Sequence, residues 1–272
     1  MRVSGGRRHY DVMRPVQFGR WIVLAALAAG AAAWGAPSYS AAGIVNAGNY
    51  ATGPFAPNSI LTIFGSGLAR SSQGLTAADI QGGLLPTELN YTRVYVDNYP
   101  APLFYVSDGQ INFLVPGNQS VGEAAIRVAM QGNSGPEVIV TIAAAAPALF
   151  GTTGSFAIAT HADNSLITGD APAVANEIIV LYATGLGKTA PNPATGELPQ
   201  YAAQITALGE LKVTIGSVVV ASDRIKYAGL TPRSGGLYQI NVAVPEGAGT
   251  DPEIRVAVGS QTSASGLKLA LR

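Results

Sequence analysis

His161 is the residue in this sequence best suited to acid–base chemistry. The 272 residues include no cysteine and two histidines, and the other histidine, His9, lies in a basic leader segment. A Ser-His-Asp triad could therefore form only around His161, whose polar neighbours include Asp163 and Ser165. Residues so close in sequence rarely converge as nucleophile, base and orienting group, and no Gly-x-Ser-x-Gly segment occurs. A hydrolase that uses His161 or loop carboxylates is the alternative hypothesis, and the leading expectation is a protein that is not an enzyme.

Two glycine-rich segments imitate nucleotide-binding motifs. Residues 185–189 read Gly-Leu-Gly-Lys-Thr, but a phosphate-binding loop needs a glycine five positions before Gly187, where this chain has Tyr182. Residues 65–67 read Gly-Ser-Gly, but the third glycine of a dinucleotide fingerprint falls on Arg70. We therefore expect no cofactor, and we interpret these glycines as turns with positive φ that end strands.

Metal ligands are scarce in the composition. The lack of cysteine and the single histidine outside the leader exclude thiolate sites and histidine clusters. The acidic residues are scattered singly, and the pairs at residues 97–98, 108–109 and 163–164 are Asp-Asn or Asp-Gly sequences typical of turns. Calcium ligation by these loops is the second interpretation. We predict no metal site.

The first 36 residues have the form of an export signal. Five arginines are followed by an apolar run at residues 21–29 and then by small residues around Trp34. The apolar segment 21–36 is shorter than the ~20 residues that a membrane-spanning helix needs. We expect cleavage between residues 33 and 42, no stable membrane insertion afterwards, and a secreted, periplasmic or cell-surface location. An uncleaved anchor is the alternative.

The charge balance argues against several partners. The chain has 16 basic and 16 acidic residues, and five of the arginines lie in the leader and are lost when it is cleaved. The remaining chain is mildly acidic, which argues against binding to nucleic acid or to anionic membranes. Charged residues make up 12% of the chain and hydrophobic residues 48%, values that exclude a disordered, solvating chain.

An internal repeat sets the expected domain organisation. Three segments recur in the same order, which indicates a duplication, and the repeated unit is too long for a solenoid. We predict two domains, at residues 43–146 and 150–272, joined near the alanine-rich segment 143–147. The matched pairs are residues 58–68 and 176–186, 110–116 and 239–245, and 126–129 and 254–257.

Within each copy, short segments rich in Val, Ile, Thr and Tyr alternate with period two between turn residues, as in a β-sandwich. A single helical turn is expected at residues 76–80. The predicted strands lie near residues 59–64, 92–97, 102–106, 110–115, 124–130 and 137–143, and near 177–182, 211–216, 218–221, 224–228, 237–244, 253–258 and 265–271. Alternation places six side chains in the core, namely Ile111, Phe113, Val115, Ile240, Val242 and Val244, and it turns Gln110 and Asn112 outward.

Several of these segments resemble a known family. Residues 56–60, 65–68, 100–107 and 110–113 are similar to the uncharacterised C-terminal domain of many secreted acidobacterial proteins, and residues 182–187, 227–230 and 236–242 are similar to its second half. Each half also resembles the IPT/TIG branch of immunoglobulin-like folds, whose mark is a strand followed by Gly-x-Gly and an apolar residue. The resemblance implies an all-β protein of two tandem immunoglobulin-like sandwiches after the signal peptide, without known catalytic residues.

Two tyrosines are candidates for recognition. In a strand, Tyr91 and Tyr95 lie on one face with Arg93 between them, while Val94 and Val96 face the core. Exposed tyrosines on a sheet are a platform for sugar rings or for a partner protein. The alternative is that they pair across strands or pack under a loop.

The second copy carries about ten more residues than the first between Ile215 and Gln239. Most of them fall in residues 228–236, which we interpret as a Gly- and Pro-rich loop at one end of the second sandwich. We predict that Leu230 and Arg233 contribute to an interface with a ligand or with the first domain. A passive loop is the alternative.

These features together predict a secreted, non-catalytic binding or adhesion module whose partner is a polysaccharide or a protein at the cell surface. The alternatives are the hydrolase described above and a structural spacer without a ligand. The sequence leaves the oligomeric state open.

Overall fold

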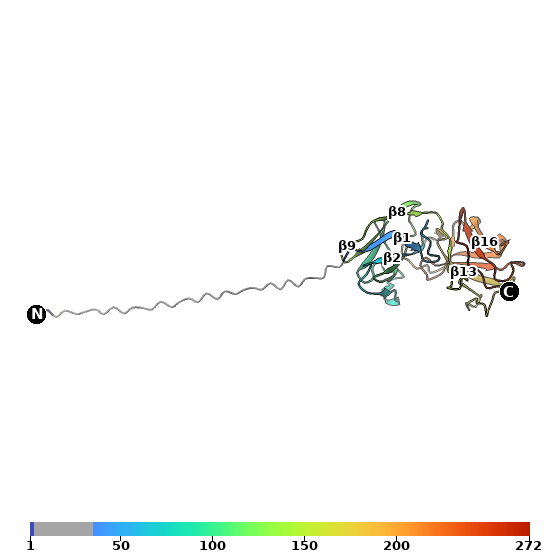
Figure 1. Ribbon diagram of the computed structural model, residues 1–272, viewed down its shortest axis with the longest axis horizontal. Coiled ribbons are helices and arrows are strands. Elements are labelled where there is room, and N and C mark those ends of the chain that lie inside the picture. Colours follow the sequence, from blue (N-terminus) through green and yellow to red (C-terminus); the bar gives the residue numbers. More distant parts are fainter. Residues whose placement is uncertain (3–34) are drawn as a thin grey trace. The chain divides into compact units, whose positions relative to one another are not determined.

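The computed structural model describes residues 1–2 and 35–272, which form an all-β structure (Figure 1). The predicted export signal lies almost entirely outside these described residues. In the part of the chain that the structure describes, no helix is long and apolar enough to cross a membrane. The only helices among the described residues are short 3-10 turns, η1 (Ala77–Asp79), η2 (Leu208–Glu210) and η3 (Ser222–Arg224). The turn η1 confirms the single helical turn expected there.

The N-terminal half is a sandwich of two antiparallel sheets. One sheet has the order β1-β2-β7-β6-β3, and the other has the order β10-β8-β4-β5, with β9 paired to β8. The bounds are β1 Ser38–Asn46, β2 Ile60–Ser66, β3 Gln73–Gly74, β4 Thr92–Val96, β5 Tyr99–Ala101, β6 Leu103–Val106, β7 Gln110–Leu114, β8 Gly122–Met130, β9 Asn133–Ser134 and β10 Val138–Ile142.

The C-terminal half is a second sandwich. Its larger sheet has the order β11-β13-β19-β18-β15-β14, with β12 paired to β13, and its smaller sheet has the order β17-β16-β20-β21. The bounds are β11 Ala148–Leu149, β12 Ala159–Thr160, β13 Ile178–Thr184, β14 Thr189–Ala190, β15 Ala203–Ile205, β16 Leu211–Ile215, β17 Val218–Val219, β18 Ile225–Leu230, β19 Tyr238–Ala243, β20 Ile254–Val258 and β21 Gln261–Thr262.

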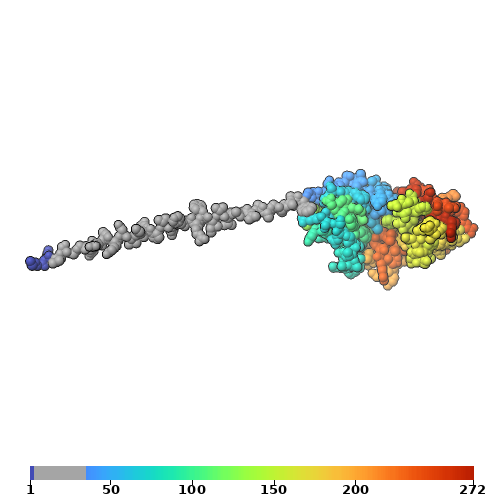
Figure 2. All heavy atoms as spheres, turned by 60° about the horizontal axis from the view of Figure 1, so that its bottom comes forward, coloured from blue at the N-terminus to red at the C-terminus, as the bar shows by residue number. Residues whose placement is uncertain are grey.

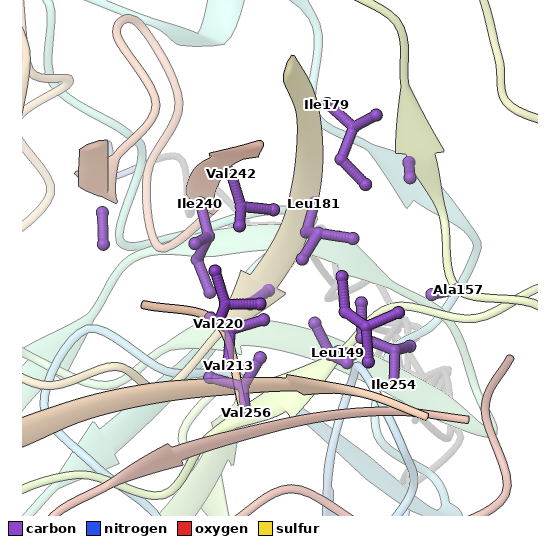
Figure 3. Close-up of a cluster of buried hydrophobic side chains, with 14 of the residues drawn as sticks. Leu149, Ala157, Ile179, Leu181, Val213, Val220, Ile240, Val242, Ile254 and Val256 are labelled. Carbon is purple, nitrogen blue, oxygen red and sulfur yellow. The ribbon is translucent and has the colours of Figure 1, made fainter. Parts of the chain in front are cut away.

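Each sandwich has its own hydrophobic core. One cluster of buried side chains runs from Ile44 to Ile142, and the other runs from Ala145 to Leu271. In the second core, Leu181 and Ile240 of the larger sheet point toward Val213 and Val256 of the smaller sheet (Figure 3). The cores follow from period-two alternation, since every second residue of a strand faces the opposite sheet.

The predicted register is confirmed in both copies. The six side chains assigned to the core are fully buried, and Gln110 and Asn112 on β7 are turned outward and half-buried. The corresponding outward pair on β19 is Gln239 and Asn241. Val94 and Val96 of β4 are buried as predicted.

Several local predictions were wrong. The sequence pattern missed β1, which pairs with β2 over Ser38–Asn46, so the expected first boundary at residue 43 cuts through a strand. Residues 265–271 make isolated bridges and no strand. The segment 228–230 was interpreted as loop but belongs to β18, because Leu230 pairs with Ala203 on one side and with Tyr238 on the other.

The two sandwiches pack directly against each other. The backbone N–H of Ile60 donates to Thr184 Oγ1 at 2.9 Å, and that hydroxyl donates to the Gly236 carbonyl, also at 2.9 Å. The Leu85 N–H donates to the Gly196 carbonyl at 2.8 Å. Blue-green atoms of the N-terminal half and orange atoms of the C-terminal half meet at this junction (Figure 2).

Candidate functional site

The two predicted tyrosines do not form a shared platform. Tyr95 is turned outward on β4 as predicted, but the Arg127 guanidinium on β8 lies over its ring, 4.7 Å from the ring centroid. Tyr91 is 64% exposed and precedes the strand with a φ of +58°. Tyr95 is therefore engaged across strands, which was the alternative interpretation, and Tyr91 lies in a turn beside the sheet.

The two predicted interface residues, Leu230 and Arg233, lie in different environments. Leu230 is 2% exposed inside the C-terminal core and so cannot contact a ligand. Arg233 is exposed, and its backbone N–H donates to the Pro199 carbonyl at 2.7 Å. Arg233 borders a hollow that Leu85 and Phe104 of the first sandwich also line. Next to it, added Cβ atoms at Gly235 and Gly236 would lie 2.7 Å from Leu85 and 2.5 Å from Leu114.

His161 is held in a structural arrangement. Its Nδ1 is hydrogen-bonded to the Glu177 carboxylate, and its Nε2 lies 3.2 Å from the Ala171 carbonyl oxygen. The hydrogen bond to Glu177 raises the pKa of His161 above its ordinary value. Because both ring nitrogens face acceptors, neither is available to take a proton from a nucleophile. This geometry does not support the hydrolase alternative.

The acidic turn residues satisfy neighbouring backbone and side-chain donors. Asp97 accepts from the Ala125 N–H at 2.9 Å and from Gln119 at 2.7 Å. Asp108 accepts from the Gly67 N–H at 3.1 Å, and Asp163 accepts from Ser165. Within the described ranges, no three His, Cys, Asp or Glu residues gather in a way that could hold a metal ion.

The two glycines that imitate a phosphate loop, Gly185 and Gly187, pack against the linker between the sandwiches. Gly185 and Gly187 have φ angles of +77° and +91°. A Cβ at these positions would lie 2.3 Å from the Ala146 carbonyl oxygen and 2.5 Å from the Ala144 carbonyl oxygen. Only glycine allows the linker to approach this closely.

An open hollow on the outer face of the larger C-terminal sheet is a candidate binding site. Its volume is about 430 Å³, and five side chains line it, namely Phe150, Ile158, Tyr182, Thr231 and Leu237. Each aromatic or aliphatic member alternates with a buried core neighbour on its own segment, so its side chain is turned away from the core and half-buried. All five lining side chains are uncharged.

Backbone pairing holds the walls of this hollow together. The Phe150 N–H donates to the Tyr182 carbonyl at 3.0 Å, and the Tyr182 N–H donates to the Ile158 carbonyl at 3.2 Å. On the other side, the Thr231 N–H donates to the Leu237 carbonyl at 2.8 Å. Three segments that are distant in sequence thus form one apolar surface.

Polar groups border this apolar surface. Gln239 lies directly across from Tyr182 in the register of β13 and β19. The Gln239 Nε2 donates to Asn241 Oδ1 at 3.1 Å, which leaves the Gln239 carbonyl oxygen and the Asn241 amide nitrogen to face outward. The buried Thr231 hydroxyl has no hydrogen-bond partner among the residues that the structure describes.

The hollow suits a neutral ligand with both apolar and hydroxyl surfaces. Aromatic and aliphatic walls bind flat apolar faces, and amides donate to and accept from hydroxyl groups. Sequence reasoning used the repeated Gln-x-Asn segments to identify the duplication, the family resemblance and the register, but not as a binding site. Nothing in the sequence showed that Tyr182 and Gln239 are cross-strand neighbours.

A comparison with family models matches residues 49–142 to the IPT/TIG domain. This match covers much of the N-terminal sandwich and agrees with the expected immunoglobulin-like fold. No curated protein sequence matches this chain.

Solved structures give weak likenesses over most of the chain. The surface glycan-binding protein SGBP-B of a Bacteroides ovatus mixed-linkage glucan utilization locus, solved with a heptasaccharide, is 13% identical with a TM-score of 0.31, over 80% of this chain and 43% of that chain. The plexin A4 extracellular region is 14% identical with a TM-score of 0.28, over 95% of this chain and 20% of that chain. The chain thus spans less than half the length of either neighbour, and no functional conclusion follows from them.

Proposed function

We propose that this chain is a secreted, non-catalytic binding module that holds a neutral polysaccharide at the cell surface. The observation that carries the proposal is the hollow around Tyr182, where uncharged apolar walls adjoin the outward amides of Gln239 and Asn241. The export-signal pattern of the first 36 residues supports the extracellular location.

The chemistry of a sugar ring fits each part of this site. The C–H faces of the sugar ring would stack on the aromatic rings of Tyr182 and Phe150. The hydroxyl group of Tyr182 would stay in contact with water. Ring hydroxyls would donate to the Gln239 carbonyl oxygen and accept from the Asn241 amide nitrogen. Anionic ligands are disfavoured because no cation lines the hollow.

The test measures binding of the mature chain to soluble neutral glucans, mannans and xylans by isothermal titration calorimetry. We expect one of these polymers to bind and Tyr182→Ala to reduce the affinity by about tenfold or more, because an aromatic contact at the centre of a site commonly contributes over 1 kcal/mol. Tyr99→Ala is the matched control, since Tyr99 is 58% exposed on the other sandwich, away from the hollow.

Two results would contradict the proposal. If the wild-type chain binds none of these polymers, the spacer hypothesis gains support. If a polymer binds but Tyr182→Ala and Tyr99→Ala have the same affinity as the wild type, the ligand lies elsewhere.

A further inference from the structure

The N-terminal sandwich presents an outward arrangement equivalent to the one beside Tyr182. On β7, the Gln110 Nε2 donates to Asn112 Oδ1 at 2.9 Å, just as Gln239 donates to Asn241 on β19. Phe64 of β2 lies across from Gln110, in the place that Tyr182 of β13 takes beside Gln239.

The correspondence extends to the strand on the other side. Tyr105 of β6 pairs with Asn112, and Tyr227 of β18 pairs with Asn241. Each sandwich therefore carries an aromatic ring, a glutamine, an asparagine and a tyrosine in the same positions of its outer face. We call these two sets the N patch (Phe64, Gln110, Asn112, Tyr105) and the C patch (Tyr182, Gln239, Asn241, Tyr227).

Core packing explains the inward residues of these strands but not the outward ones. Ile111 and Ile240, which alternate with the amides, are fully buried and supply the hydrophobic core. The amides lie on the outer faces and add no apolar burial between the sheets. An outward amide pair flanked by aromatic rings supplies the groups that bind neutral, hydroxyl-bearing ligands.

The N patch offers an accessible apolar surface. Phe64 is 41% exposed, and its ring centroid lies 6.2 Å from that of Tyr50, which is 63% exposed, with the planes tilted by 32°. Asn112 Oδ1 also accepts from Thr62 at 3.0 Å, so the Asn112 amide nitrogen is the group left for a ligand. The four side chains of the patch are uncharged, as in the C patch.

One segment of the second sandwich, residues 231–237, contacts both of the sheets that carry the patches. Its members Thr231 and Leu237 line the hollow next to Tyr182. Its Gly236 approaches the outward side chains of Ile60 and Leu114, where an added Cβ would lie 2.8 Å and 2.5 Å from them. Ile60 and Leu114 form the cross-strand pair two steps along β2 and β7 from Thr62 and Asn112 on the same outer face. Residues 231–237 therefore border the hollow beside Tyr182 and also pack on the outer face of the sheet that carries the N patch, next to Thr62 and Asn112.

We infer that the N patch is a second site for the same neutral polysaccharide, so that one polymer chain contacts both sandwiches at once. This inference rests on the proposed function. The packed junction fixes the spacing of the two patches, so the second contact is made at high effective concentration and the polymer gains avidity over a short oligosaccharide.

The test uses the neutral polymer that the wild-type chain binds and a short oligosaccharide cut from it. Calorimetry should find two short ligands per wild-type chain, and one per chain for the double variant Phe64→Ala with Gln110→Ala and for Tyr182→Ala. Affinity for the polymer should fall by about 100-fold when either patch is lost. Ile139→Ala is the control, because Ile139 is 53% exposed on the other sheet of the same sandwich.

The outcomes separate the inference from the function on which it rests. One short ligand per wild-type chain, with polymer affinity unchanged in the Phe64 and Gln110 variant, would overturn the second site and leave the first. No binding by the wild-type chain would overturn both. Thermal unfolding of each variant shows whether the sandwich remains folded, and the single change Gln110→Ala, on the outer face, replaces the double variant if that variant unfolds.

Discussion

At the scale of single residues, the pair His161 and Glu177 makes stability depend on pH. The hydrogen bond to Glu177 raises the pKa of His161 above 6.5, the ordinary value that the unfolded chain retains. Folding therefore favours the protonated ring, and its stabilising contribution is complete below pH 6.5. That contribution is lost as the pH rises through the folded-state pKa. We expect the free energy of unfolding to fall as the pH rises above about 6.5.

Denaturant titrations across this range would measure the effect. His161→Gln keeps a hydrogen-bonding side chain but cannot titrate there, so its free energy of unfolding should lack this decline. An identical decline in the wild type and in the variant would show that other groups cause it.

At the scale of elements, close contacts with the first sandwich constrain the segment between β18 and β19. Gly236 has a φ of +71°, and a Cβ there would lie 2.5 Å from Leu114 and 2.8 Å from Ile60. Gly247 has a similar φ of +77° but nothing within 4 Å of its Cβ position. Gly247→Ala should cost about 1–2 kcal/mol for the left-handed conformation alone. Gly236→Ala should cost roughly 1–3 kcal/mol more, because the new methyl group overpacks the junction.

Thermal and denaturant unfolding of the two variants would measure how much the contact between the sandwiches contributes to the free energy of unfolding. Equal losses of stability would mean that the segment adapts without disturbing its neighbours in the first sandwich.

At the scale of the whole molecule, the N-terminal strand limits where the mature chain can begin. Ser38 and Tyr39 pair with β2, and the Tyr39 hydroxyl donates to the Pro136 carbonyl at 2.5 Å while accepting from the Val128 N–H at 2.8 Å. Loss of Tyr39 would leave these groups unpaired. The predicted cleavage range is residues 33–42. We therefore expect the chain to be cleaved before Ser38, within the first part of this range.

Intact-mass measurement of the exported protein would locate this N-terminus. A chain beginning at residue 43 should melt at a lower temperature than one beginning at residue 37. Equal melting temperatures, or a leader retained in the exported protein, would contradict this expectation.

The sequence by itself determined which side of β4, β7 and β19 faces the core. Alternation along β7 and β19 placed Phe113 and Val242 inside, because a strand turns successive side chains to opposite faces. The recurring segments predicted two sandwiches, and the lack of cysteine limited the chemistry of any site. These are local properties, readable from neighbouring residues.

Only the tertiary structure decided which outward side chains meet. Phe150, Tyr182 and Leu237 line one hollow because strand pairing brings β11, β13 and β19 together, and alternation carries no information on strand order. The same reason explains the error at Leu230, where a Gly-rich composition predicted a loop. Cross-strand hydrogen bonds to neighbours on both sides hold that segment in the sheet, and they outweigh its low intrinsic preference for a strand.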